Sequence, residues 1–571
     1  MGTVYPESRT TYNRIYTKLN FLYGEERAES VYKQLVELIG DVEAPPRQRL
    51  NLTERDALLI AYGDHVQRAG EAPLQTLRKT LKTTIYPTVN GLHILPFYPY
   101  SSDDGFSVID YIAVDPALGT WDDVRAFKPE FKLMFDAVIN HISAQSAWFK
   151  GFLSGDPIYK DYFIPTDPNL DLSLVTRPRA LPLLSPFETP SGTQHLWTTF
   201  SDDQIDLNFA NPDVLIAILK VLLFYVEQGA DLIRLDAIAF MWKCVGTTCI
   251  HLPETHSVIQ LMRDVLDVVA PHVILITETN VPHSENISYF GSGDDEAQMV
   301  YQFSLPPLTL HTFRTGDATI LSQWAATIER LSDRTTFFNF TASHDGIGVR
   351  PALGLLTADE INALVRMTEA HGGLVSYKNN PDGTQSPYEL NITYFDAITN
   401  PAITAVQPEI AVSRFICSQA IMLAMVGVPG IYLHSLFGSR NFRAGVEQTG
   451  RNRTINREKL AADALLSELA DETSLRHAVF TRYKHLLDVR EQHKSFHPLG
   501  TQKVLDFGKA IFALERISPD GSERVLALHN VSGNAQTVSL RDGRWSDMIN
   551  GIESKTGLML APYQVAWLVQ I

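Results

Sequence analysis

Cysteine is scarce in this chain, which has only Cys244, Cys249 and Cys417 among its 571 residues. An odd and small number of cysteines cannot build a disulfide framework, so we expect a reducing compartment and a cytoplasmic protein. Cys244 and Cys249 have no partners at a recognisable metal-ligand spacing, which favours ordinary core or surface thiols. Beyond Asn140 no candidate calcium ligands cluster in the sequence, so we predict no bound metal and no cofactor.

Positive charge is also in short supply. The chain has 48 Lys and Arg against 65 Asp and Glu, a formal net charge of −17, which argues against DNA or RNA as a partner but allows a local basic pocket for a small anion. The polar N-terminus lacks the basic start and apolar core of a signal peptide. The most apolar window, residues 420–437, is split by Gly427, Pro429 and Gly430, and predicts a helix followed by a strand instead of a membrane span.

Apolar residues are abundant, at 45% of the chain, which is enough for a large core. They form eight short runs, with helix-like segments in most of the intervals between them. The runs are residues 57–63, 91–97, 132–140, 231–239, 273–280, 299–304, 335–345 and 428–438. Repeated strand-helix units are typical of a parallel sheet, and eight of them predict an α/β fold, the (β/α)8 TIM barrel.

Two intervals are too long for a simple crossover, and they predict subdomains inserted after the third and seventh barrel strands, at the rim where active sites of this fold lie. Alternating runs separated by turn signals near the end of the chain predict an antiparallel β domain. The predicted parts are an N-terminal helical extension (1–55), the barrel (56–141, 207–345 and 402–497), an inserted B domain (142–206), an inserted B′ subdomain (346–401) and the C-terminal β domain (498–571).

Two opposite charges interrupt the apolar run "DLIRLDAIAF" (231–240). Residues two apart on a strand point to the same side, so Arg234 and Asp236 share one face. A guanidinium next to a carboxylate favours the ionised acid and fixes its orientation, as a nucleophile requires. A structural ion pair is the plainer interpretation of this dipeptide taken alone.

Three other runs also end in acids or imidazoles: His141 closes "DAVINH", Glu278 follows "VILI", and His344 and Asp345 close "FTASHD". The ends of parallel barrel strands meet at one rim, where several carboxylates would repel one another unless their ionisation states differed. Glycoside cleavage is the main reaction class that needs two carboxyls of different pKa and no metal or organic cofactor.

The segments "DAVINH", "IRLDAIAF", "ITETN" and "TASHD" resemble, in this order, the four signature regions of the α-amylase superfamily, glycoside hydrolase family thirteen. The resemblance implies Asp236 as the nucleophile, Glu278 as general acid and then base, and Asp345 as a third carboxylate that grips the sugar. It also implies that Arg234 holds Asp236, and that His141 and His344 bind glucosyl hydroxyls.

Further segments resemble the sucrose phosphorylase group of that superfamily. "LPFYPYSSDDGFSVIDY" (95–111) implies that Asp103 binds the 4-hydroxyl and that Phe106 stacks on the glucosyl ring. "NRTINR" (452–457) implies that Arg453 pairs with Asp103 and closes the pocket around one glucose. "TTFSDDQIDLN" (198–208) is similar to a segment with a wall aromatic, Phe200, and an amide, Gln204.

The loop "TRPRALPLLSPF" (176–187) is similar to the Arg-Pro-Arg loop of the same group, in which Arg179 meets phosphate and Arg177 lies nearby. A phosphorylase has to bring an anion next to carboxylates, and the forked guanidinium suits that task, although both arginines could be solvated loop charges. We therefore predict a retaining α-glucoside phosphorylase that acts on sucrose and inorganic phosphate and gives α-glucose 1-phosphate and fructose.

Several alternatives stay open at this point. Segments after the fourth and seventh strands resemble the branch with sucrose 6-phosphate and glucosylglycerate phosphorylases, which makes Arg350, Tyr388 and Glu389 candidates for binding the leaving group. A charged acceptor would need a cation such as Arg350, whereas a neutral one would suit Glu389. Fructose, fructose 6-phosphate, glycerate and glycerol remain possible, as do a hydrolase or transglucosidase of the same fold and a non-catalytic barrel. The resemblance also allows a homodimer.

Overall fold

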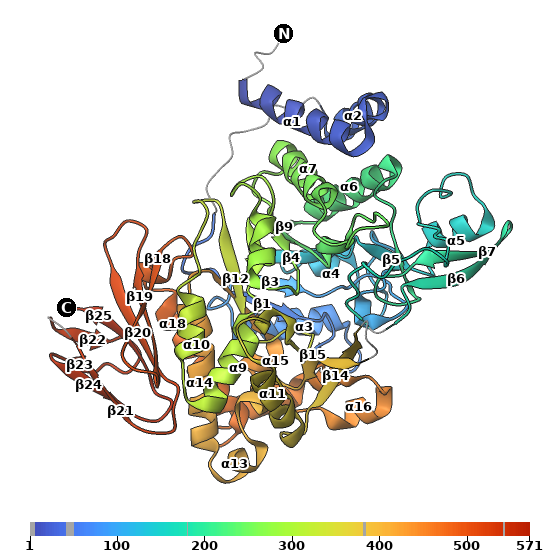
Figure 1. Cartoon of the computed structure of the whole chain (residues 1–571). Coiled ribbons are helices and arrows are strands. Elements are labelled where there is room, and N and C mark those ends of the chain that lie inside the picture. Colours follow the sequence, from blue (N-terminus) through green and yellow to red (C-terminus); the bar gives the residue numbers. More distant parts are fainter. Residues whose placement is uncertain (1–5, 41–50, 180, 381–383, 541–542) are drawn as a thin grey trace.

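The computed structural model describes residues 6–40, 51–179, 181–380, 384–540 and 543–571. The chain begins with a helical hairpin, α1 (Pro6–Tyr23) and α2 (Glu25–Ile39), which packs on the barrel helices α6 (Pro212–Glu227) and α7 (Pro253–Val269) (Figure 1). Gly24 and Gly40, with φ of 76° and 74°, end the two helices in a conformation that glycine adopts without strain. Residues 1–5 and 41–50 of the predicted helical extension lie outside the described residues.

Eight parallel strands form a closed barrel, as predicted, and each predicted apolar run supplies one of them. In chain order they are β1 (Leu58–Ala61), β3 (Gly91–Ile94), β4 (Lys132–Ala137), β9 (Ala230–Leu235), β10 (Ile274–Thr277), β11 (Met299–Tyr301), β12 (Thr336–Phe340) and β16 (Val428–Tyr432). Their residues are almost all buried, because side chains fill the barrel on one face and helices cover the other. This explains why the runs are continuously apolar.

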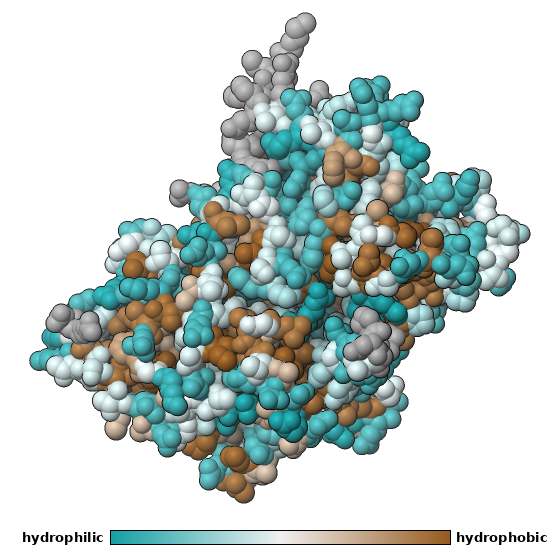
Figure 2. Space-filling model, in the orientation of Figure 1, coloured by the Kyte–Doolittle hydropathy of each residue, from teal (hydrophilic) through white to brown (hydrophobic). Residues whose placement is uncertain are grey.

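Helices surround the barrel, among them α3 (Pro73–Thr84), α9 (Leu305–Thr315), α14 (Pro408–Ala424) and α18 (Leu475–Arg490). The apolar window 420–437 contains the end of α14 and then β16, as predicted from its glycines and proline. Within the described part of the chain, none of the helices has the length and apolar character needed to cross a membrane. On the face shown in Figure 2, hydrophobic residues form separate patches bordered by hydrophilic ones.

Antiparallel elements follow two of the barrel strands and cover the same rim. After β4 come β5 (His141–Ser143), which pairs with β8 (Gln204–Asp206), and the hairpin of β6 (Leu184–Thr189) and β7 (Gly192–Trp197). After β12 comes a three-stranded sheet of β13 (Ile347–Gly348), β15 (Gln385–Asn391) and β14 (Leu374–Asn379). The limits given above for the inserted parts stay predictions.

The chain ends in an antiparallel β domain, as predicted. Its six-stranded sheet contains β18 (Thr501–Leu505), β19 (Ile511–Ile517), β20 (Arg524–Asn530), β25 (Val565–Gln570), β22 (Trp545–Asp547) and β23 (Glu553–Ser554), and a further pair is β21 (Gln536–Ser539) with β24 (Gly557–Leu560). Phe512, Leu514 and Trp567 belong to the same buried cluster as the barrel. The buried Arg516 donates to the Ala424 carbonyl at 2.7 Å. The two parts therefore share one core.

Candidate active site

A pocket opens where the barrel strands end, and nearly all the residues predicted from sequence line it. They are Asp103, Phe106, His141, Arg179, Phe200, Gln204, Asp236, Glu278, His344, Asp345, Arg350, Tyr388, Glu389 and Arg453. The exceptions are Arg234, which is buried and contacts Asp236 from within the barrel, and Arg177, which lines a second hollow. The structure thus gathers residues from segments more than 300 positions apart into one place.

Arg234 connects the acids of this pocket. Its guanidinium lies 2.8 Å from Asp236 Oδ1 and 3.9 Å from Glu278 Oε2, and it also forms an ion pair with the buried Asp136. His93 Nε2 lies 2.6 Å from the other oxygen of Asp136. Burial alone would raise the pKa of Asp136, but Arg234 and His93 lower it to about 2. The charges within the apolar run 231–240 therefore belong to a buried, hydrogen-bonded network.

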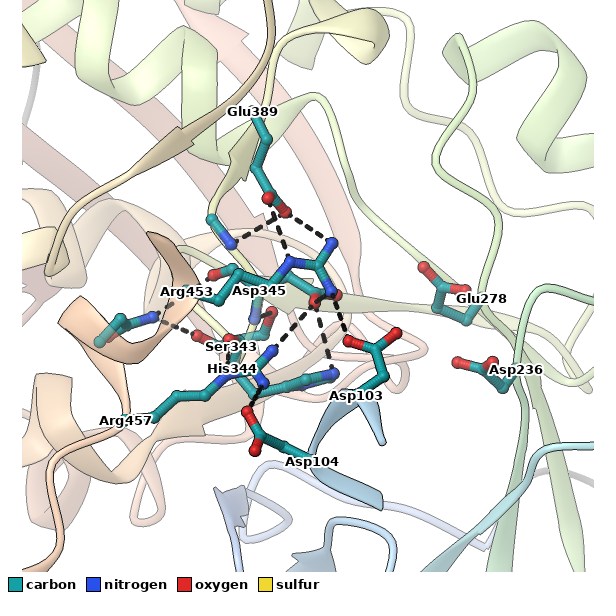
Figure 3. A network of polar contacts seen from close by, with 12 residues as sticks. Asp103, Asp104, Asp236, Glu278, Ser343, His344, Asp345, Glu389, Arg453 and Arg457 are labelled. Atoms are coloured by element: carbon teal, nitrogen blue, oxygen red, sulfur yellow. Dashed lines mark hydrogen bonds and ion pairs between the residues drawn. The ribbon is translucent and has the colours of Figure 1, made fainter. Parts of the chain in front are cut away.

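Asp236 and Glu278 lie side by side, and their carboxylates point toward Asp103 and Asp345 (Figure 3). Burial raises the pKa of Asp236 to about 8, with a further increase from Glu278, although Arg234 acts in the opposite direction. Burial also raises the pKa of Glu278, and the negative charge of Asp345 adds to it. Two buried carboxyls that interact in this way hold one proton between them near neutral pH.

Asp345, just beyond β12, has the opposite electrostatic setting. Burial would raise its pKa, but the charges of Arg453 and Arg457 hold it well below the usual range. Arg453 Nη1 lies 2.6 Å from Asp345 Oδ1 (Figure 3). The His344 ring stacks on Phe106 with ring centres 4.7 Å apart, and burial lowers the pKa of His344 to about 3. Asp345 is therefore ionised next to a neutral imidazole.

Asp103 has a different main partner from the one that the resemblance implied. Arg179 Nη2 lies 2.8 Å from Asp103 Oδ2, whereas Arg453 Nη1 is 3.9 Å from Asp103 Oδ1. Arg179 also lies over the Phe200 ring, 5.5 Å from its centre. Burial would raise the pKa of Asp103, but the arginines keep it well below its ordinary value. The reason for this difference is that Arg453 already forms ion pairs with Asp345, at 2.6 Å, and with Glu389, at 3.0 Å.

The three residues predicted to bind the leaving group, Arg350, Tyr388 and Glu389, all line the pocket. Glu389 accepts from Arg453 and from the Gly346 amide at 3.0 Å, so both of its oxygens already have partners. Burial raises the pKa of Tyr388 to about 12, which keeps its hydroxyl neutral. Arg350 has a single ion pair among the described residues, with Glu285 at 3.7 Å.

Sequence reasoning missed two cations near this pocket. Arg457, the second arginine of "NRTINR", forms an ion pair with Asp104 and donates to the His344 carbonyl at 2.7 Å. The buried Lys243 lies 2.6 Å from Asp206 Oδ2 and 3.0 Å from the Asn140 oxygen. The motif itself could have indicated Arg457, whereas nothing in the sequence connects Lys243 with Asp206. Among the described residues no group of three or more His, Cys, Asp or Glu could hold a metal ion.

A pair of buried carboxyls at the C-terminal rim of a (β/α)8 barrel is an arrangement with which enzymes act on glycosidic bonds. Residues 87–359 match the family described as alpha amylase, catalytic domain. The chain belongs to the α-amylase family, glycoside hydrolase family thirteen, and within it to the sucrose phosphorylase group of glycoside phosphorylases. The sequence-based resemblance is confirmed.

Curated relatives match over most of their length. A glucosylglycerate phosphorylase of Allomeiothermus silvanus is 50% identical over 100% of both chains, and one of Spirochaeta thermophila is 52% identical over 91% of this chain and 89% of its own. A sucrose phosphorylase of Streptococcus mutans is 28% identical over 84% of this chain and 98% of its own. The solved sucrose 6F-phosphate phosphorylase of Thermoanaerobacter thermosaccharolyticum has the same fold, with a TM-score of 0.73, 23% identity and coverage of 88% and 98%.

Proposed function

We propose that this enzyme is a retaining phosphorylase that converts glucosylglycerate and inorganic phosphate into α-glucose 1-phosphate and glycerate. The observation that carries the proposal is the full-length identity of 50% to a glucosylglycerate phosphorylase, against 28% to a sucrose phosphorylase. Sucrose was the first expectation from sequence, and the comparisons favour the glucosylglycerate alternative over it.

The reaction proceeds in two displacements. The Asp236 carboxylate attacks the anomeric carbon, the bond from that carbon to the glycerate oxygen breaks, and Glu278 gives its proton to the departing oxygen. A phosphate oxygen then attacks the same carbon, the bond to Asp236 breaks, and Glu278 takes up the phosphate proton. Arg234 lies 2.8 Å from Asp236 and 3.9 Å from Glu278, so in the reactive form of the pair its charge favours the anion on Asp236 and the shared proton on Glu278.

The remaining pocket residues hold the glucosyl group in this proposal. Asp345 and Asp103 accept hydrogen bonds from sugar hydroxyls, for which their ionised state suits them. Phe106 and Phe200 provide apolar faces for the ring. His141, Gln204 and His344 line the pocket as further hydrogen-bonding partners of the sugar.

The anions are bound by arginines at the mouth of the pocket. Arg179 is the phosphate ligand, and Arg350 binds the carboxylate of glycerate, because its only described ion pair is the long one with Glu285. Tyr388 supplies a neutral hydroxyl beside it. Glu389 acts mainly through Arg453, which it holds in place with two hydrogen bonds.

The test runs the reaction in reverse, with glucose 1-phosphate and glycerate, fructose, fructose 6-phosphate or glycerol, and measures released phosphate. We expect the highest kcat/KM for glycerate. Glycerol is the matched neutral control, because it has a hydroxymethyl group where glycerate has a carboxylate. In Arg350→Gln we expect kcat/KM for glycerate to fall about tenfold or more, because one charge-assisted hydrogen bond is lost. The decrease in kcat/KM for glycerol should be smaller. Equal or faster turnover with fructose would contradict the proposal.

A further inference from the structure

A second hollow adjoins the active-site pocket and is much larger. We call it the outer chamber; its volume is about 910 Å³. Its polar lining includes Arg177, Arg179, His195, Arg350, Lys378 and Asn380. Arg179 and Arg350 line the active-site pocket as well, so the two hollows meet at these two side chains.

Part of the wall of the outer chamber is packed. Val175 and Leu183 line it, and both belong to a small buried cluster with Trp197 and Cys249. The β6–β7 hairpin provides His195, and β14 provides Lys378. Elements from both antiparallel regions at the rim therefore contribute to the lining of the chamber.

The charge of this lining is unusual for a protein with a net charge of −17. None of the described residues that line the outer chamber is Asp or Glu. Lys378 is partly buried, and among the described residues it has no side-chain hydrogen bond or ion pair. Burial lowers the pKa of Lys378, and the guanidinium of Arg350 lowers it further.

Arg177 completes this set of cations. Its described side-chain hydrogen bond is to a neutral acceptor, the Leu181 carbonyl. Arg177, Arg350 and Lys378 thus line the same hollow. In the described part of the chain these three cations have a single acidic partner, Glu285, which lies 3.7 Å from Arg350. Cations placed together with so little compensation repel one another, and an anion between them would relieve the repulsion.

We propose that the outer chamber is a second anion-binding site, in which Lys378, Arg177 and Arg350 hold a small oxyanion before it passes between Arg179 and Arg350 to the reacting centre. The ligand class is a phosphate or a small carboxylate. The link to turnover rests on the proposed function, since phosphate, glycerate and glucose 1-phosphate are all anions that the net charge of the protein repels. A local positive site raises the concentration of such ions at the mouth of the pocket.

The kinetic test uses Lys378→Met, which keeps the length of the side chain and removes its charge, Arg177→Gln, and the double variant. We expect the KM for inorganic phosphate to rise about fivefold in the single variants and further in the double variant. The KM for a neutral donor, p-nitrophenyl α-glucoside, should change less, so the ratio of the two constants increases. Lys150→Gln removes the same charge from an exposed position on α5 (Ala147–Ser154) and should leave the ratio unchanged.

A binding test separates the outer chamber from the catalytic pocket. In the Arg179→Gln background, which weakens the pocket's own phosphate site, calorimetric titration with inorganic phosphate should still detect binding, and adding Lys378→Met should abolish it. Titration with glycerate shows whether carboxylates share the site. An unchanged phosphate KM in the double variant, or no phosphate binding in the Arg179→Gln background, would overturn the inference. If glycerate fails as acceptor while phosphate still binds, the proposed function is wrong and the anion site stands.

Discussion

Asp236 is held by opposing influences: a guanidinium 2.8 Å away favours its charge, while burial and Glu278 oppose it. The pKa of Asp236 rises from about 3.8 to about 8, and because Asp236 shares one proton with Glu278, the folded pair binds this proton more tightly than the unfolded chain does. The stabilisation is complete below pH 4 and is lost as the pH rises toward 8. Asp236 therefore weakens the fold near neutral pH, where the proposed mechanism needs its charge.

This gives a prediction for Asp236→Asn, which keeps the shape of the side chain but cannot ionise. We expect the difference in Tm between the variant and the wild type to become more positive from pH 5 to pH 8 and to reach a few degrees at pH 8. Turnover should be lost. Thermal unfolding at the two pH values measures the difference in Tm. A Tm difference that stays constant or shrinks with pH would contradict the raised pKa.

Lys243 gives a second prediction at this scale. Its ammonium is buried against Asp206, and Lys243→Met would leave that carboxylate without its cation. Removing one partner of a buried pair costs about 3 kcal/mol or more, which should lower the Tm by several degrees. The double variant Lys243→Met, Asp206→Asn is the control, because it removes the orphaned charge and should recover part of the loss. No recovery would indicate that Lys243 acts through packing.

Single residues differ in how far the sequence could place them. Arg234 and Asp236 were predicted to share a face because the alternation of a strand is local. The partner of Asp103 was not predictable from spacing. Arg179 follows Asp103 by 76 positions and Arg453 by several hundred, and both compete for the same carboxylate. The pairing of Lys243 with Asp206 has no sequence signal for the same reason.

At the scale of elements, the barrel strands were the most predictable part of the molecule, since burial on both faces leaves an apolar run in the sequence. After β4 and β12 the sequence predicted inserted subdomains from the length of the intervals, but not their strands. The pairing of β5 with β8, for example, joins segments some sixty residues apart. The N-terminal extension was expected as helical, and the break at Gly24 makes it a hairpin of two helices.

Close contact between two barrel strands gives a prediction for Gly430 in β16. A Cβ there would lie 2.3 Å from the Phe338 ring of β12, and the ring is fully buried. Gly430→Ala should therefore destabilise the barrel by about 2 kcal/mol or more. Thermal unfolding measures the loss. Adding Phe338→Leu frees space and should recover part of it, whereas an unchanged Tm for Gly430→Ala would show that the barrel adjusts.

At the scale of the whole molecule, the barrel and the C-terminal β domain share a core, and Arg516 fastens one to the other. Its guanidinium donates to carbonyls of Ala424, His497 and Thr501. We expect a single thermal transition in which near-UV circular dichroism and activity are lost together, and Arg516→Met should lower the Tm of both signals equally. Two separate transitions, or an active chain ending at residue 497, would contradict a shared core.

Arg453 has one more consequence, which concerns synthesis. It joins Asp345 to Glu389 and approaches Asp103, yet it lies more than a hundred positions after Asp345, the last of the three carboxylates proposed to act in catalysis. A ribosome makes these acids first. A nascent chain that already carries Asp236, Glu278 and Asp345 therefore lacks part of the proposed sugar site until the segment around residue 453 leaves the exit tunnel, so we expect no turnover before that segment has folded.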